Sequence, residues 1–206
     1  MDERVKQSMA RWPDVPAAWG WLRLDRRGQW RILDRNAPGF DETRDGAGNP
    51  IRHEALIDFI CRNYSADPQG RWYFQNGPQR VYVDLEMGPL VWRVAAAPDG
   101  ATLVAHTGEV AQHIERLAMD SEGTVWAQSE LGPGAIDDRQ LAALLASSEN
   151  DPVHSDEGGT GLSTEDDARA QWPQVRLRGQ EKPLRISALG SSAEQAFGFV
   201  RRPRAN

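Results

Sequence analysis

Three titratable side chains gather near the start of a predicted helix. His53, Glu54 and Asp58 fall within residues 52–64, where apolar residues recur three and four positions apart. A carboxylate beside an aromatic wall can have a raised pKa that suits acid–base catalysis. A zincin-type metal site needs two histidines four positions apart, and this segment has one, so no metal site is predicted. His53, Glu54 and Asp58 are therefore the catalytic candidates if the protein is a small enzyme.

The aromatic wall is expected from the hairpin at residues 71–83, which turns at Asn76-Gly77. Alternation along its strands places Trp72 and Phe74 on one face. The other face offers side chains that can stack on and hydrogen-bond a flat ligand or an extended peptide: Tyr73, Gln75, Arg80 and Tyr82. The alternative is that the aromatic residues only cover helix 52–64 while their polar neighbours face water.

Other catalytic motifs are weak in this sequence. Cys61 is the single cysteine and falls in the predicted helix, where a buried, unreactive thiol is expected. The glycine-rich run at residues 158–161 follows no strand, lacks a lysine and has acidic neighbours that would repel phosphate. No cofactor is predicted.

Charge divides the chain into an acidic body and a basic tail. Residues 147–168 hold seven acidic residues and no Lys or Arg, which predicts a disordered linker. Residues 169–206 carry eight basic and two acidic residues, and alternation there predicts a hairpin with one basic face. The tail residues expected to bind a partner are Arg176, Arg178, Arg185, Arg201 and Arg202.

The tail has two expected modes of action, docking on the acidic body or binding an acidic protein partner. A third possibility is nucleic-acid binding, because the basic cluster at residues 201–204 lies near Phe197 and Phe199, which can stack on bases. The net charge of −6 argues against a protein whose whole surface binds nucleic acid.

The body, residues 1–146, is predicted to alternate hairpins with helices. Four hairpins are expected, at residues 21–32, 70–83, 90–106 and 118–126, each with a glycine-containing turn. Helices are expected at 52–64, at about 108–117 and after Asp137. The predicted fold class is α+β, with short antiparallel β-hairpins alternating with amphipathic helices packed on one face. This pattern allows either one body or two lobes, at about 12–97 and 98–146.

Several motifs together resemble a known family. They are Gly20-Trp21-Leu-x-Leu, Asn49-Pro50-Ile51-x-His53-Glu54, the stretch from Gly70 to Val83, and Gly123-Thr-Val-Trp126. Over about residues 12–148 the chain is similar to short conserved hypothetical proteins of proteobacteria that form a domain of unknown function. The resemblance implies a bacterial, cytoplasmic setting and carries no residue role.

No secretory signal or membrane-spanning run is recognised, so a cytoplasmic location without membrane contact is expected. The leading functional hypothesis is a non-enzymatic binding or regulatory module. The small enzyme and the nucleic-acid-binding tail are the alternatives.

Overall fold

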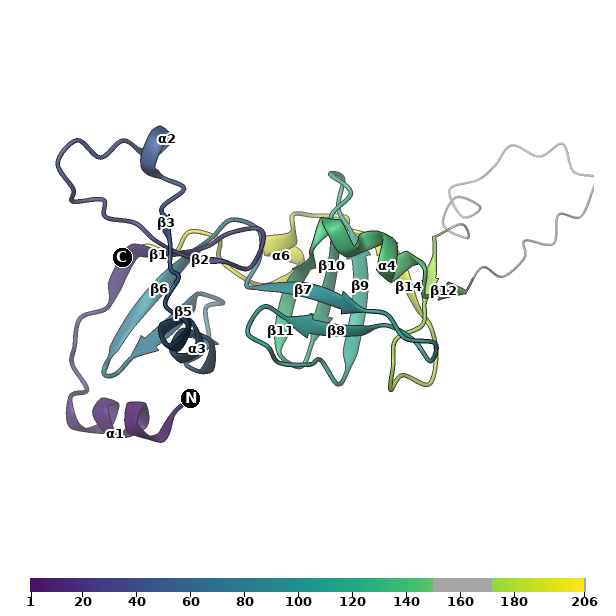
Figure 1. Ribbon diagram of the computed structural model, residues 1–206, viewed down its shortest axis with the longest axis horizontal. Coiled ribbons are helices and arrows are strands. Elements are labelled where there is room, and N and C mark those ends of the chain that lie inside the picture. The colour runs from purple at the N-terminus through teal and green to yellow at the C-terminus, as the bar shows by residue number, and fades with distance from the viewer. Residues whose placement is uncertain (150–171, 206) are drawn as a thin grey trace, which may run out of the picture.

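The computed structural model describes residues 1–149 and 172–205, which form two mixed β-sheets side by side (Figure 1). The first sheet contains β1 (Ala18–Leu24), β2 (Trp30–Ile32), β3 (Asn49–Pro50), β4 (Tyr64–Ala66), β5 (Trp72–Asn76) and β6 (Gln79–Leu85). The second contains β7 (Leu90–Ala95), β8 (Thr102–Ala105), β9 (Ile114–Met119), β10 (Val125–Ser129), β11 (Gly132–Ile136), β12 (Ser148–Glu149), β13 (Gln174–Val175) and β14 (Leu184–Ala188).

The helices within the described residues are short and lie around these sheets. They are α1 (Glu3–Arg11), α2 (Glu42–Asp45), α3 (Glu54–Arg62), the 3₁₀ helix η1 (Asp138–Gln140), α4 (Leu141–Leu145) and α6 (Ala193–Phe197). None of the helices in this part of the chain has the length and apolar character needed to cross a bilayer.

The predicted fold class is wrong, although the four predicted hairpins exist. Their strands pair as β1–β2, β5–β6, β7–β8 and β9–β10, all antiparallel. The hairpins do not stay separate units with helices between them, because parallel pairs join β1 to β6, β7 to β11, and β9 to β14. The strand orders are β3-β2-β1-β6-β5-β4 and β12-β13-β14-β9-β10-β11-β7-β8, so the protein is mostly β.

The helix predicted at residues 108–117 is instead a turn followed by β9. Its register with β10 shifts between Gln128 and Ser129, so that Glu115 is the extra residue of a β-bulge. The bulge brings Ile114 and Leu117, which are three positions apart, into the core together. Apolar spacing of three residues is typical of a helix, and here the bulge produces it in a strand.

The second sheet curls on itself. The Ala101 N–H donates to the carbonyl of Arg176, and the Arg178 N–H donates to the carbonyl of Ala101, both at 2.9 Å. Strands β8 and β12 lie at the two edges of this sheet. The residue before β8 nevertheless bonds to the segment after β13, which brings the two edges together. The core inside includes Trp92 and Trp126, both 0% exposed.

Three turns share one construction, Asp-x-x-Gly, at Asp25, Asp67 and Asp120. In each, a carboxylate oxygen accepts two main-chain N–H groups, two and four residues later. The glycine three residues after the aspartate has a φ between 73° and 81°, which favours glycine over other residues. The sequence shows this pattern, and the structure shows that it closes the β1–β2, β4–β5 and β9–β10 connections.

The C-terminal residues connect the two sheets (Figure 1). Strand β13 pairs antiparallel with β14, and the chain then passes through α6 to the first sheet. There the carbonyl of Arg201 accepts from the Leu85 N–H at 2.8 Å, and the Val200 N–H donates to the carbonyl of Gly70 at 3.0 Å. Most of the predicted acidic linker, residues 150–168, lies outside the described residues, as does the glycine-rich run at 158–161.

Candidate functional site

The three predicted catalytic residues lie on the exposed side of α3. His53 precedes the helix, and its Nδ1 accepts from the Leu56 N–H at 3.2 Å. Glu54 and Asp58 are exposed. Phe59 on the same helix packs edge-on against Phe74 at 5.4 Å, so α3 covers the Phe74 face of the first sheet. Tyr73 and Tyr82 belong to the opposite face, which separates the catalytic candidates from the predicted polar aromatic surface.

That polar aromatic surface is largely buried. Gln75 pairs with Arg80 and Tyr73 pairs with Tyr82 across the hairpin. Tyr73 and Tyr82 are 6% and 3% exposed, and Gln75 is 1% exposed. Arg80 is exposed, and its guanidinium lies 4.7 Å from the ring centre of Tyr73.

Trp19 completes this surface, and the sequence reasoning missed it. Its ring stacks on Tyr82 with centres 3.9 Å apart, and the Arg71 guanidinium lies 5.1 Å from the Tyr82 ring centre. The Tyr82 hydroxyl donates to Asp67 at 3.0 Å. Burial acts to raise the pKa of Asp67, but hydrogen bonds from Arg71 and Tyr82 bring it below its ordinary value. These groups form their hydrogen bonds and stacking contacts with other residues of the protein, as core residues do.

Cys61 is partly buried, and its Sγ accepts from the indole N–H of Trp30 at 3.3 Å. Burial raises the pKa of this thiol, which makes it a poor nucleophile.

The five tail arginines occupy two separate places. Arg178 pairs with Asp99 at 3.0 Å beside the second sheet, Arg176 lies near the same segment, and Arg185 is exposed on β14. Arg201 and Arg202 lie against the first sheet, beside the charged residues around Asp84. The structure therefore does not bring the five arginines together into one basic face.

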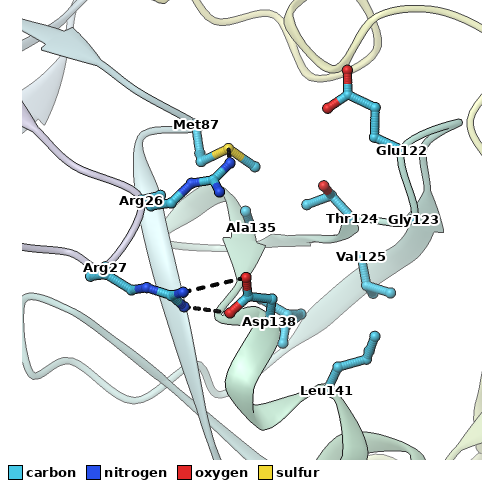
Figure 2. Close-up of a pocket in the computed structure, with 11 residues that line it drawn as sticks. Arg26, Arg27, Met87, Glu122, Gly123, Thr124, Val125, Ala135, Asp138 and Leu141 are labelled. Carbon is cyan, nitrogen blue, oxygen red and sulfur yellow. Dashed lines mark hydrogen bonds and ion pairs between the residues drawn. The ribbon is translucent and has the colours of Figure 1, made fainter.

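A cleft at the junction of the sheets combines polar and apolar groups (Figure 2). Two of the Asp-x-x-Gly turns form its sides. Arg26 and Arg27 come from the β1–β2 turn, while Glu122 and Gly123 come from the β9–β10 turn across from it. The remaining lining residues are Met87, Thr124, Val125, Ala135, Ile136, Asp138 and Leu141. The cavity volume is about 210 Å³.

Ion pairs fix one side of this junction cleft. The Arg27 guanidinium lies 2.7 Å from Asp137 and also pairs with Asp138, which links the first sheet to the segment after β11. Asp137 is 2% exposed and also accepts from Arg139. The hydrogen bond from Arg139, with a further contribution from the charge of Arg27, lowers the pKa of Asp137 to about 2. Asp137 is therefore ionised at neutral pH.

Two further charged groups of the cleft, Arg26 and Glu122, are more exposed. The Arg26 Nε lies 3.4 Å from Glu86, and its side chain is 53% exposed. Glu122 is exposed on the facing turn, with the half-buried Thr124 beside it. Figure 2 shows the Arg26 and Glu122 side chains on opposite sides of the cavity, with Met87 and Ala135 between them. The cleft thus offers a cation and an anion above an apolar floor.

Sequence reasoning missed the junction cleft. Its only visible signal was the repeated Asp-x-x-Gly turn, and Arg26, Arg27, Glu122 and Asp138 look like ordinary turn residues in the sequence. The two turns face each other because one sheet packs against the other. A local sequence pattern carries no information about that packing.

A family model described as "Protein of unknown function (DUF2946)", labelled DUF2944, matches residues 1–204. The chain belongs to this family. The expected membership of a domain of unknown function is thereby confirmed, and the match extends beyond the resemblance at residues 12–148. A search of the curated proteins found no match.

Two solved structures are similar to the chain, and both are described as DUF1285 family proteins. The one from Silicibacter pomeroyi DSS-3 is 18% identical with a TM-score of 0.50, and the alignment covers 88% of this chain and 84% of that one. The one from Shewanella baltica OS155 is 11% identical with a TM-score of 0.43, covering 61% and 91%. At these identities the likeness to the first structure concerns the fold alone.

Proposed function

We propose that the protein is a non-enzymatic, cytoplasmic binding module that holds a small ligand in the junction cleft. The observation that carries the proposal is the placement of Arg26 and Glu122 on opposite sides of an apolar floor, where two sheets meet (Figure 2). Ligand sites occur preferentially at such junctions and combine apolar walls with a few polar groups.

The cleft suits a ligand that carries both charges on an apolar frame, as a free amino acid with an apolar side chain does. Arg26 would pair with the carboxylate and Glu122 with the ammonium group, since each retains exposed polar atoms. The apolar side chain would contact Met87 and Leu141. A cavity of about 210 Å³ lies below the range of roughly 300–1,000 Å³ typical of sites for drug-sized ligands, which favours a small molecule.

Isothermal titration calorimetry with the twenty free amino acids tests this proposal. We expect saturable heat from leucine, isoleucine or methionine, and a loss of at least about tenfold in affinity in Arg26→Ala and in Glu122→Gln. Arg52→Ala and Glu115→Gln remove exposed charges elsewhere and are the matched controls. Absence of binding by every amino acid, or equal losses in the controls, would reject the proposal.

The two alternatives have less support from the geometry. The enzyme hypothesis requires His53, Glu54 or Asp58 to open onto a cleft beside the aromatic hairpin 71–83. Helix α3 does pack against Phe74 of this hairpin, but all three side chains are exposed on the outer side of the helix. For nucleic-acid binding through the tail, the two stacking candidates Phe197 and Phe199 lie against Trp126, with ring centres 6.0 Å and 5.8 Å away.

A further inference from the structure

A second cavity, lined by an unusual density of arginines, lies on the face of the first sheet that carries Asp84. It has a volume of about 180 Å³ and is lined by Arg23, Arg35, Glu42, Asp84, Leu85, Glu86, Arg201 and Arg202. Arg23 and Asp84 are direct partners on the parallel strands β1 and β6. Arg201 and Arg202 reach this arginine cleft from the C-terminal segment.

Carboxylates hold three of the nearby arginines. Arg23 lies 3.2 Å from Glu86, while Arg35 lies 3.1 Å from both Glu42 and Asp84. Arg204, just outside the lining, lies 2.7 Å from Asp84. Their guanidinium groups are therefore fixed in place, and the three acids of the lining are already paired.

Two arginines remain with unused donors. Arg202 is exposed, and within residues 1–149 and 172–205 it makes no hydrogen bond or ion pair. The Arg201 Nε lies 3.7 Å from Glu194 Oε2, beyond hydrogen-bond distance, and the Arg201 side chain is 38% exposed. Both guanidinium groups therefore retain donors that a ligand in the cleft can reach.

The local charge is positive although the whole chain is acidic. Arg23, Arg35, Arg201, Arg202 and Arg204 give five positive charges, against four negative charges from Glu42, Asp84, Glu86 and Glu194. The hydrogen bond from Arg35 lowers the pKa of Glu42, and the more distant charges of Arg202 and Arg23 add to this effect. The same positive field favours any further anion that enters the cleft.

The tail main chain is held beside the cleft at Arg201. The Arg201 N–H donates to Glu194 Oε1 at 2.9 Å, and the Arg201 carbonyl accepts from the Leu85 N–H at 2.8 Å. A guanidinium carries several N–H donors in a fixed plane and matches the oxygens of a phosphate group.

We propose that the arginine cleft binds a small phosphate-type oxyanion, inorganic phosphate or a soluble phosphate monoester, through Arg201 and Arg202. Arg23 and Arg35 line the site and add positive charge behind it. This site is separate from the junction cleft, and its occupancy does not depend on the function proposed for that cleft.

Isothermal titration calorimetry of the full chain with inorganic phosphate, at constant ionic strength maintained with chloride, tests the proposal. We expect saturable 1:1 binding that weakens at least about tenfold in Arg202→Ala and is partly restored in Arg202→Lys. Arg185→Ala is the matched control, because it also removes an exposed tail arginine, from β14. Thermal unfolding in chloride alone verifies that each variant is folded.

A second arm uses methyl phosphate as a soluble monoester, because it lacks the amino-acid groups expected to bind in the junction cleft, and acetate as a carboxylate. Tighter binding of methyl phosphate than of phosphate assigns the site to monoesters, and the reverse assigns it to the free ion. Heat that does not saturate, or an equal loss in Arg185→Ala, would show only general attraction to arginines and would overturn the proposal. Acetate binding as tight as phosphate binding would overturn the assigned chemical class.

Discussion

The two sheets differ in how far their large apolar residues are exposed to solvent. Five of the six large apolar residues that are exposed within the described chain belong to its first 56 residues: Met1, Trp12, Trp21, Ile32 and Leu56. Val110 is the sixth and lies near the second sheet. That sheet instead buries Trp92 and Trp126 completely. A sheet that curls on itself encloses its apolar face, whereas the open first sheet leaves part of that face to α3 and to solvent.

The exposed apolar residues of the first sheet are not scattered. Trp21, Ile32 and Leu56 line one groove of about 480 Å³ between α3 and the strands. The arginine cleft lies on the other face of the same sheet, because Val81 of the groove and Asp84 of the cleft are three positions apart on β6. Both sheets contribute to one buried core, and the exposed apolar groove belongs to the first sheet.

The largest expected effect is the removal of a tryptophan from the second sheet. Trp126 is fully buried and donates to Asp120 at 2.8 Å, so Trp126→Ala should lower the free energy of unfolding by about 3–5 kcal/mol. Trp21→Ala is the matched variant in the first sheet, where 44% exposure predicts a loss of about 1 kcal/mol or less. Urea denaturation measures both, and equal losses in the two variants would contradict the difference in burial between these two tryptophans.

His106 tests the contact between the sheets. Its ring centre lies 5.3 Å from that of Trp30, and burial lowers the pKa of His106 to about 3. In the unfolded chain histidine takes up a proton below about pH 6.5, so the unfolded state binds more protons between pH 6.5 and 3. The free energy of unfolding should therefore fall by roughly 1 kcal/mol per pH unit as the pH drops from 6.5 to 4.5.

The measurement is urea denaturation across this pH range for the wild type, His106→Leu and His113→Gln. His106→Leu should lose most of the pH dependence, and His113→Gln, an exposed control, should keep it. An unchanged slope in His106→Leu would show that His106 is not held neutral between the sheets.

Asp137 tests the ion pairs at the junction. Asp137→Asn removes the charge that pairs with Arg27 and Arg139, and we expect a loss of about 2 kcal/mol in urea denaturation at pH 7. Asp138→Asn, whose side chain is 65% exposed, should lose much less. The contribution of Asp137 is present above pH 4 and disappears as the pH falls through about 2, because its pKa is lowered in the folded state. A larger loss in Asp138→Asn would show that the more exposed carboxylate, Asp138, contributes more to the junction than Asp137 does.

The smallest expected effect concerns the exposed groove. Ile32→Thr keeps a β-branched residue in β2 at a position that is 50% exposed, and it should change stability by no more than about 0.5 kcal/mol. Val83→Thr is the contrasting variant, at a position of the same sheet that is 0% exposed, and should lose clearly more in thermal unfolding. Similar losses in the two variants would mean that the groove is part of the core.

Local patterns predicted the local structure of this protein well. The Asn76-Gly77 turn and the glycines at 28, 100 and 123 marked all four hairpins, because turn chemistry is decided within a few residues. The parallel pairs β1–β6 and β9–β14 were not predictable in this way, since they join segments far apart in the chain. The prediction of the fold class was wrong for this reason. In addition, the bulge at Glu115 gives strand β9 the apolar spacing of a helix.

The candidate sites also depended partly on local sequence patterns and partly on contacts between distant segments. Sequence reasoning selected Arg201 and Arg202 from their charge, but the parallel placement of Arg23 beside Asp84 supplied the rest of the arginine cleft. The polar face of Tyr73 and Tyr82 was paired as predicted, yet its burial depended on Trp19 and Arg71, which reach it through tertiary contacts.

The most direct test of the junction cleft is a two-dimensional ¹H–¹⁵N NMR titration of the full chain with L-leucine. We expect saturable shifts of the amides of Arg26, Arg27, Gly123 and Thr124, from both turns at one affinity, while the amides of the rest of the second sheet stay unchanged. Shifts confined to the groove at Trp21 and Ile32, or the absence of saturable shifts, would contradict a ligand site between the sheets.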